Sequence, residues 1–130
     1  MARILLIDDD SVLLKLYSTR LTADKHIVDT AANGEEGYEK IRLARPDVIV
    51  LDLLMPKVNG FTFLETLNKY PDLQKIPKII FSSVANQEQI ERLKALGIKI
   101  FLNKIETTPT QLVGVINQII GPPGAAQSQT

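Results

Sequence analysis

The chain has 130 residues, 45% of them hydrophobic and 23% charged, values typical of one globular domain rather than a disordered or membrane-embedded chain. Fifteen basic and fifteen acidic residues leave no net charge, so there is no basic excess to support direct binding to nucleic acid. The absence of cysteine and the single histidine exclude disulfides, cysteine-bound metals and a histidine metal cage.

The hydrophobic segments are all short. None approaches the length of a membrane span, and the run from Ile4 to Ile7 is too short for a signal peptide. We therefore expect a cytoplasmic protein without membrane insertion.

Five short apolar runs alternate with longer amphipathic segments. This alternation predicts parallel strands joined by crossover helices, with the strands buried on both faces of the sheet. The expected strands are Arg3–Ile7, Ile27–Thr30, Val48–Leu51, Lys78–Phe81 and Lys99–Leu102.

Each expected strand is followed by helix start and stop signals, such as asparagine caps, a residue before proline, or glycine after the last turn. The expected helices run from Asp10 or Ser11 to Leu21, from Asn33 to the Arg45–Pro46 step, from Gly60 to about Tyr70, from Asn86 to Gly97, and from Thr108–Pro109 to Ile120. Residues 1–120 thus form one α/β domain. The remaining residues 121–130, GPPGAAQSQT, lack apolar periodicity and read as a flexible tail or a truncated linker.

Aspartates follow two of the expected strands. Asp8, Asp9 and Asp10 end the first strand and Asp52 ends the third. In an open parallel sheet, ligands bind beyond the carboxyl ends of the strands, so neighbouring strands would bring these carboxylates into one crevice. Like charges that close require a proton or a cation, and a cluster of oxygen ligands suits Mg²⁺ together with a phosphate. The alternative interpretation is that these aspartates only end a strand and cap a helix.

A hydroxyl and a cation follow the last two strands. Ser82 ends the fourth strand and Lys104 follows the fifth, and both side chains complement a phosphate group. Ser83 could supply the hydroxyl instead. Each residue alone is explained as a turn residue or a solvated lysine, but their joint position at one edge of the sheet indicates a phosphate-handling site.

At this point the sequence resembles the receiver domain of two-component response regulators, in the chemotaxis-receiver-like single-domain form. The matching segments are ILLIDDDS, VIVLDLLMPKVNG, the serine pair after KIIF, and GIKIFLNK. The resemblance covers about residues 2–120. It implies a doubly wound, flavodoxin-like five-stranded parallel sheet of strand order 2-1-3-4-5.

The resemblance also assigns roles to individual residues. It makes Asp52 the phosphoacceptor and makes Asp8, Asp9, Asp52 and the backbone carbonyl of Leu54 the ligands of Mg²⁺, with Mn²⁺ as a substitute. Ser82 and Lys104 would bind the phosphoryl group. Because positioning and charge neutralisation supply most of phosphoryl transfer, such a domain assists its own phosphorylation and dephosphorylation without being an enzyme in the usual sense.

The implied output is a switched surface. Ser82 and the aromatic Phe101 would move together and change the face formed by the fourth expected helix, the fifth strand and the fifth helix. The implied partners are a histidine kinase or phosphotransfer protein and a downstream protein on that face. The chain would be a monomer or a weak, phosphorylation-dependent dimer.

Residues near the expected phosphorylation site lead to predictions about dephosphorylation and about the loop after the lysine. Leu54 and Val84 stand two residues beyond Asp52 and Ser82, and neither can orient a water molecule, so we expect slow self-dephosphorylation. Ile105 stands where proline usually follows the lysine. A cis bond before a residue other than proline costs about 2.5–4 kcal/mol, so we expect a trans peptide, a rearranged loop and poorer reach of Lys104 toward the phosphate.

His26, at the start of the second strand, is expected to be a solvated residue far from the crevice.

Three other functions fit the sequence less well. A haloacid-dehalogenase-like phosphate-handling enzyme would need a second acid where Leu54 stands. A dinucleotide-binding enzyme conflicts with the acidic turn after the first strand, which would repel a pyrophosphate. A receiver-like docking domain that is not controlled by phosphate is disfavoured by the intact set of acids, hydroxyl and lysine.

Overall fold

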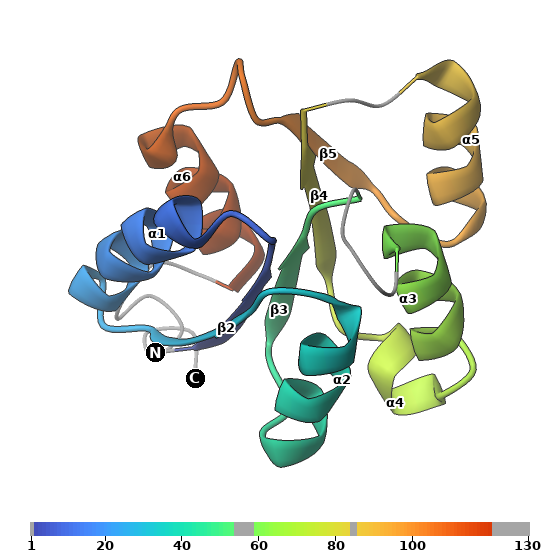
Figure 1. The fold of residues 1–130 in the computed structure, drawn as a ribbon, viewed down its shortest axis with the longest axis horizontal. Helices are drawn as coiled ribbons and strands as arrows, with labels where there is room; N and C mark the ends of the chain where they lie inside the picture. The colour runs from blue at the N-terminus through green and yellow to red at the C-terminus, as the bar shows by residue number, and fades with distance from the viewer. Residues whose placement is uncertain (1, 54–58, 84–85, 121–130) are drawn as a thin grey trace.

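The sheet is the centre of the fold. The computed structural model describes residues 2–53, 59–83 and 86–120. All strand pairings are parallel and the strand order is β2-β1-β3-β4-β5, which confirms the predicted doubly wound, flavodoxin-like topology (Figure 1). The strands are β1 (Arg3–Ile7), β2 (Ile27–Ala31), β3 (Val48–Leu51), β4 (Lys78–Ser82) and β5 (Ile100–Asn103).

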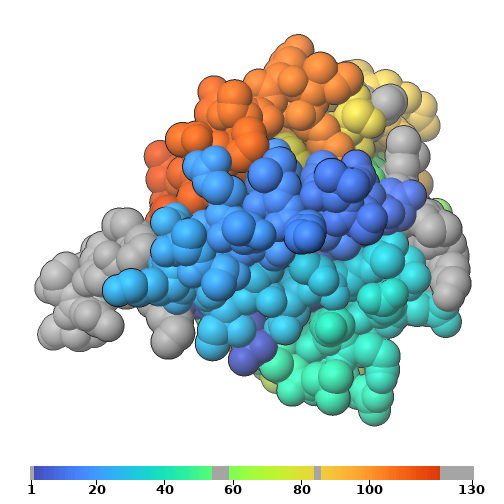
Figure 2. Space-filling view, turned by 60° about the vertical axis from the view of Figure 1, so that its left-hand side comes forward, coloured from blue at the N-terminus to red at the C-terminus, as the bar shows by residue number. Residues whose placement is uncertain are grey.

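Helices cover both faces of the sheet. In Figure 1, α1 and α6 lie on one side of it and α2, α3, α4 and α5 on the other. Figure 2 shows the first of these faces, where α1 and α6 lie side by side. The helices are α1 (Ser11–Ala23), α2 (Gly34–Leu43), α3 (Gly60–Leu67), α4 (Pro71–Gln74), α5 (Gln87–Ala95) and α6 (Pro109–Ile120).

Two hydrophobic clusters result from this layering. Alternate residues of the strands point to opposite faces, so Ile49 and Ile80 pack under α2, α3 and α5, whereas Val50 and Phe81 pack under α1 and α6. All four residues of β3 and all five of β4 are buried, as expected for central parallel strands. The central strands therefore hold their carboxyl ends at fixed positions relative to each other.

Polar caps begin the helices where the sequence indicates them. Asp10 accepts from the backbone N–H groups of Val12 and Leu13 at the start of α1, and Asn33 caps α2 in the same manner. At the start of α6, Thr108 Oγ1 accepts from Gln111 N at 3.1 Å while Gln111 Oε1 accepts from Thr108 N at 2.9 Å. This reciprocal pair is a capping box, with a proline in the first turn.

The third expected helix is shorter than predicted. It ends at Leu67 instead of Tyr70, and a separate one-turn helix, α4, begins at Pro71. Proline is accepted in a first helical turn but not in the interior, so the apolar pattern divides there into two helices. The structure therefore has six helices within the described residues where five were expected.

His26 corrects another expectation. It lies far from the carboxyl ends of the strands, as predicted, but it is buried rather than solvated, with 4% of its surface exposed. Its Nδ1 accepts from the N–H of Ala2 at 3.3 Å, and its Nε2 lies 3.0 Å from Asn117 Oδ1. His26 therefore connects the start of β2 to α6.

No helix among the described residues is long and apolar enough to cross a membrane. The expected tail, residues 121–130, lies outside the described part of the chain.

Candidate functional site

Two buried aspartates lie at adjacent strand ends. Asp8 follows β1 and Asp52 follows β3, and the two strands pair in register from Ile4 with Val48 to Ile7 with Leu51. The backbone N–H of Asp52 donates to Ile7 O at 3.0 Å, which extends the ladder past the last paired residues. Only 3% of Asp8 and 5% of Asp52 is exposed. The prediction that the carboxylates of Asp8 and Asp52 lie close together is thus confirmed.

The other two aspartates of the acidic turn have different positions. Asp9 is exposed, and one carboxylate oxygen each from Asp8, Asp9 and Asp52 lie within 4.8 Å of one another. Asp10 turns away to cap α1, while its own N–H donates to Asp8 Oδ1 at 2.9 Å. Three carboxylates therefore lie close together, and the fourth, that of Asp10, is the N-cap of α1.

Lys104 lies between the two buried aspartates. Its Nζ is 2.6 Å from Asp8 Oδ2 and 3.0 Å from Asp52 Oδ2, and 17% of its side chain is exposed. The backbone N–H of Lys104 donates to Ser82 O at 3.1 Å, so the end of β4 holds its main chain. The ammonium group partly neutralises two carboxylates that would otherwise repel each other.

Burial and pairing act on these groups in opposite directions. Burial raises the pKa of Asp8, although hydrogen bonds from Lys104 and from the Asp10 N–H oppose the rise. Burial alone would lower the pKa of Lys104, but hydrogen bonds to Asp8 and Asp52 outweigh it and raise that pKa above the usual value. The lysine is therefore held in its charged form beside the carboxylates.

Asn103 shapes the loop between β5 and α6. The peptide between Lys104 and Ile105 is trans, as predicted, and no cis bond occurs among the described residues. Asn103 Oδ1 accepts from the N–H groups of Ile105 at 2.8 Å and Glu106 at 3.3 Å. With this trans bond Lys104 still contacts both aspartates, and its poorer reach toward a phosphate stays a prediction. Sequence reasoning missed Asn103, although an asparagine directly after a strand is a recognised turn signal.

The two candidate hydroxyls differ in burial. Ser82 is the last residue of β4, with 4% of its surface exposed, whereas Ser83 is exposed. Ser82 pairs in register with Asn103, so it lies at the same edge of the sheet as Lys104. Phe101 is half-buried on β5 and packs against the hydrophobic cluster under α5.

Gly60 permits a close approach beneath the site. A Cβ atom there would lie 2.9 Å from Leu53 Cα and 3.2 Å from Asp52 O, closer than a side chain tolerates. The start of α3 therefore packs directly against the residues that follow β3. Leu54 and Val84, which the resemblance links to metal binding and dephosphorylation, lie outside the described residues.

The donor set fits a hard divalent cation. Asp8, Asp9 and Asp52 offer only carboxylate oxygens, the ligand type that Mg²⁺ prefers, and one of the three residues is exposed to solvent. The Lys104 ammonium beside two of them neutralises part of the negative charge and leaves Asp9 as the member without an ion pair to it.

An acidic cluster and a lysine at the carboxyl edge of a flavodoxin-like sheet define a phosphoacceptor signalling domain, and comparison with known proteins agrees. The model of the response regulator receiver domain matches residues 4–117. The chain therefore belongs to the receiver-domain family of response regulators. The haloacid-dehalogenase-like and phosphate-independent alternatives are not favoured.

Curated proteins resemble the chain over a part of their own length. The chain is 39% identical over 103 residues to a protein-glutamate methylesterase/protein-glutamine glutaminase of Bacillus subtilis, a match that covers 78% of this chain and 28% of that protein. It is 33% identical over 117 residues to a gliding motility regulatory protein of Myxococcus xanthus, covering 90% of this chain and 15% of that protein. The chain thus spans less than a third of either relative.

Solved structures share the fold over nearly their full length. The chemotaxis protein CheY4 of Vibrio cholerae has a TM-score of 0.84 at 28% identity, with 92% of this chain and 98% of that chain covered. The N-terminal domain of a protein from Wolinella succinogenes has the same TM-score and identity, with 92% and 94% covered. The chain is similar to both structures in fold and extent.

Proposed function

We propose that Asp52 is the phosphoacceptor of this receiver domain. The observation that carries the proposal is the position of its carboxylate, which is buried at the end of β3, clustered with Asp8 and Asp9, and 3.0 Å from the Lys104 ammonium. In the reaction, an Asp52 oxygen forms a bond to the phosphorus of a phosphohistidine on a kinase or phosphotransfer protein. The bond from phosphorus to the imidazole nitrogen breaks, and the nitrogen leaves with the electron pair.

The surrounding residues take supporting roles. Lys104 is close enough to Asp52 to neutralise charge on the added phosphoryl oxygens, and Ser82, buried at the end of β4, is the hydroxyl that we expect to hydrogen bond to them. Asp8, Asp9 and Asp52, with the Leu54 carbonyl that the resemblance implies, would hold Mg²⁺. When bound, this ion would supply further positive charge for the transfer.

The test is a mass measurement of the protein after incubation with Mg²⁺ and a small-molecule phosphodonor such as acetyl phosphate. We expect one added phosphoryl group, which Asp52→Asn abolishes and Asp10→Asn retains, because Asp10 serves as a helix cap. Equal labelling of the Asp52→Asn variant would overturn the assignment, whereas labelling shifted to Ser82 or Ser83 would indicate a reserve acceptor.

We propose that the signal leaves through the face formed by α5, β5 and α6. Phe101 lies on the middle element of this face and also lines a shallow depression with Gln111 and Gly114 of α6. Movement of Ser82 toward a phosphoryl group would leave space for the ring to turn inward and change this surface. The proposed partners are thus a phosphodonor kinase at the acidic site and a downstream protein on this face, with residues 1–120 acting as the unit that both recognise.

We also propose that the phosphorylated form is long-lived. The side chains of Leu54 and Val84 cannot hold an attacking water by hydrogen bonds, so hydrolysis of the aspartyl phosphate lacks a positioning group. Replacing both, Leu54→Asn with Val84→Glu, is expected to shorten the half-life of the phosphorylated protein, as measured by loss of the added mass. An unchanged half-life would show that other groups control water access.

A further inference from the structure

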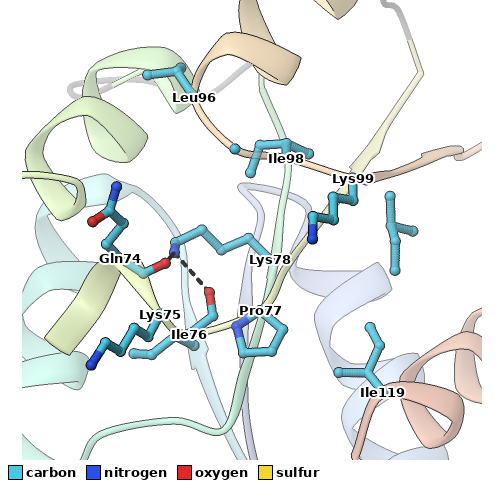
Figure 3. A pocket seen from close by; sticks show the side chains of 11 residues that line it. Gln74, Lys75, Ile76, Pro77, Lys78, Leu96, Ile98, Lys99 and Ile119 are labelled. Carbon is cyan, nitrogen blue, oxygen red and sulfur yellow. Dashed lines mark hydrogen bonds between the residues drawn. The ribbon is translucent and has the colours of Figure 1, made fainter. Parts of the chain in front are cut away.

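A second concave site lies at the edge of the sheet opposite the acidic cluster. The groove, of about 390 Å³, is formed by the amino-terminal ends of β4 and β5, the turn after α5 and the end of α6 (Figure 3). Its apolar lining includes Pro77, Ile98, Ile100 and Ile119. This volume lies within the range of small-molecule sites, about 300–1,000 Å³.

All ionisable residues that line the groove are lysines. They are Lys75, Lys78 and Lys99, and no carboxylate of the described residues accompanies them in the lining. Figure 3 shows the exposed Lys99 pointing into the groove and Lys75 pointing away from it. In a chain without net charge, this local excess of positive charge favours an anion.

Lys78 contributes charge to the groove without being a free donor. Its buried Nζ donates to three backbone carbonyls, of Leu73 at 3.0 Å, Gln74 at 3.1 Å and Ile76 at 2.8 Å. The carbonyls at the end of α4 are thereby occupied. A peptide segment would bring its own N–H groups into the groove and would find at least one lone pair of each of these carbonyls already used, whereas a small molecule with a single polar end needs no such partners.

We propose that this groove binds a small aliphatic carboxylate. The aliphatic chain would cover Ile98, Ile100 and Ile119, and the carboxylate would pair with the Lys99 ammonium. Removal of apolar surface from water drives such binding, and the lysine sets the orientation of the ligand. This proposal is independent of phosphoryl transfer at Asp52.

The test uses the full chain and octanoate as the probe, followed by the shifts of its backbone amide signals in NMR spectra. We expect saturable shifts at Ile98, Lys99 and Ile119. Lys99→Gln is expected to weaken octanoate binding by about two- to fivefold, as for loss of an exposed ion pair. Ile119→Ala is expected to weaken it further through lost apolar contact, while Lys15→Gln, which removes an exposed lysine of α1, leaves affinity unchanged.

Several outcomes would overturn the proposal. The first is a set of octanoate-induced shifts that do not saturate. The second is binding of 1-octanol as tight as that of octanoate, together with no effect of Lys99→Gln on octanoate binding. The third is saturable binding of an acidic peptide without saturable binding of octanoate. Phosphorylation of Asp52 in the Lys99→Gln variant is expected to match the parent. Failure of this proposal is therefore distinguishable from failure of the proposed function.

Discussion

Two lysines at opposite edges of the sheet show how a buried cation depends on its partners. Lys104 contacts the carboxylates of Asp8 and Asp52, and this pairing raises its pKa in spite of burial. The Lys78 ammonium donates to three backbone carbonyls and has no carboxylate partner among the described residues, and burial lowers its pKa to about 8. Full negative charges compensate the loss of water around an ammonium better than carbonyl dipoles do.

The lowered pKa of Lys78 predicts a pH-dependent stability. Between pH 8 and 10.5 the unfolded chain binds more protons at this position than the folded one, so the contribution of Lys78 to stability increases as pH rises through this window. Relative to Lys78→Met, we expect the free energy of unfolding of the parent to rise by about 2–3 kcal/mol across it. Urea unfolding of both proteins at pH 7.5, 9 and 10 measures the difference.

The comparison with Lys78→Met removes the contributions of other groups that titrate in the same range. A difference in stability that stays constant over these pH values would contradict the lowered pKa. Below pH 8 the Lys78→Met variant loses the hydrogen bonds to three carbonyls but also loses the cost of a buried charge. The difference between these two contributions sets the stability of the variant relative to the parent at low pH.

At the scale of elements, the loop between β5 and α6 positions the lysine of the site. Asn103 Oδ1 accepts two backbone N–H groups of this loop, and Asn103 O accepts a third from Thr107 at 2.9 Å. A side-chain turn of this kind supplies the rigidity that a proline would otherwise provide after the lysine. The loop therefore directs Lys104 toward the aspartates through a trans peptide.

Asn103→Ala is expected to loosen this loop. Loss of two hydrogen bonds predicts a decrease of about 1–2 kcal/mol in the free energy of unfolding. It also predicts a slower initial rate of phosphorylation by a small-molecule donor, because Lys104 is held less firmly near Asp52. The measurements are urea unfolding and the rate of mass increase.

Asn68→Ala is the matched control for this variant. Asn68 Nδ2 donates to Leu96 O at 3.1 Å, so its loss weakens packing between α3 and the turn after α5, away from the site. We expect lower stability but an unchanged rate of phosphorylation. Equal rates in the Asn103→Ala variant and the parent would show that the loop does not position the lysine.

At the scale of the whole molecule, metal binding at the acidic site would be coupled to folding. The three carboxylates come from two turns that are brought together only by the pairing of β1 with β3, so the unfolded chain has no comparable site. A ligand that binds only the folded state stabilises it by mass action.

We therefore expect Mg²⁺ to raise the melting temperature of the parent. At ten times the dissociation constant the gain is about 1.4 kcal/mol. Asp9→Asn should remove most of the gain, because it removes one of the three clustered carboxylates. Asp9 is exposed, so its substitution disturbs little packing. Thermal unfolding with and without Mg²⁺ measures the effect. Asp72→Asn, which changes an exposed aspartate of α4, is expected to respond as the parent does, and an equal response of Asp9→Asn would contradict the proposed ligand role.

Most of the fold was predictable from local pattern. Each apolar run became a strand with a shift of at most one residue at either end, because a strand buried on both faces requires an uninterrupted apolar run. The helix caps Asn33 and Asn86 were equally clear, and Asp10 was one of two candidates for the first helix, whereas the cap Asn59 of α3 was not predicted. The division at Pro71 was missed, since the apolar spacing continued past the end of α3.

The sequence by itself determined the order of chemical groups along the chain, namely which strand ends carry Asp8, Asp52, Ser82 and Lys104. These assignments follow from local pattern and resemblance, and the roles of the four residues stay predictions until the phosphorylation experiments are done. Only the tertiary structure decided that Lys104 reaches both aspartates, that Asn103 holds its loop, and that Lys78 and His26 are buried. The physical reason is that burial and side-chain contact depend on residues distant in sequence: His26 meets Asn117 only after α6 packs on the sheet.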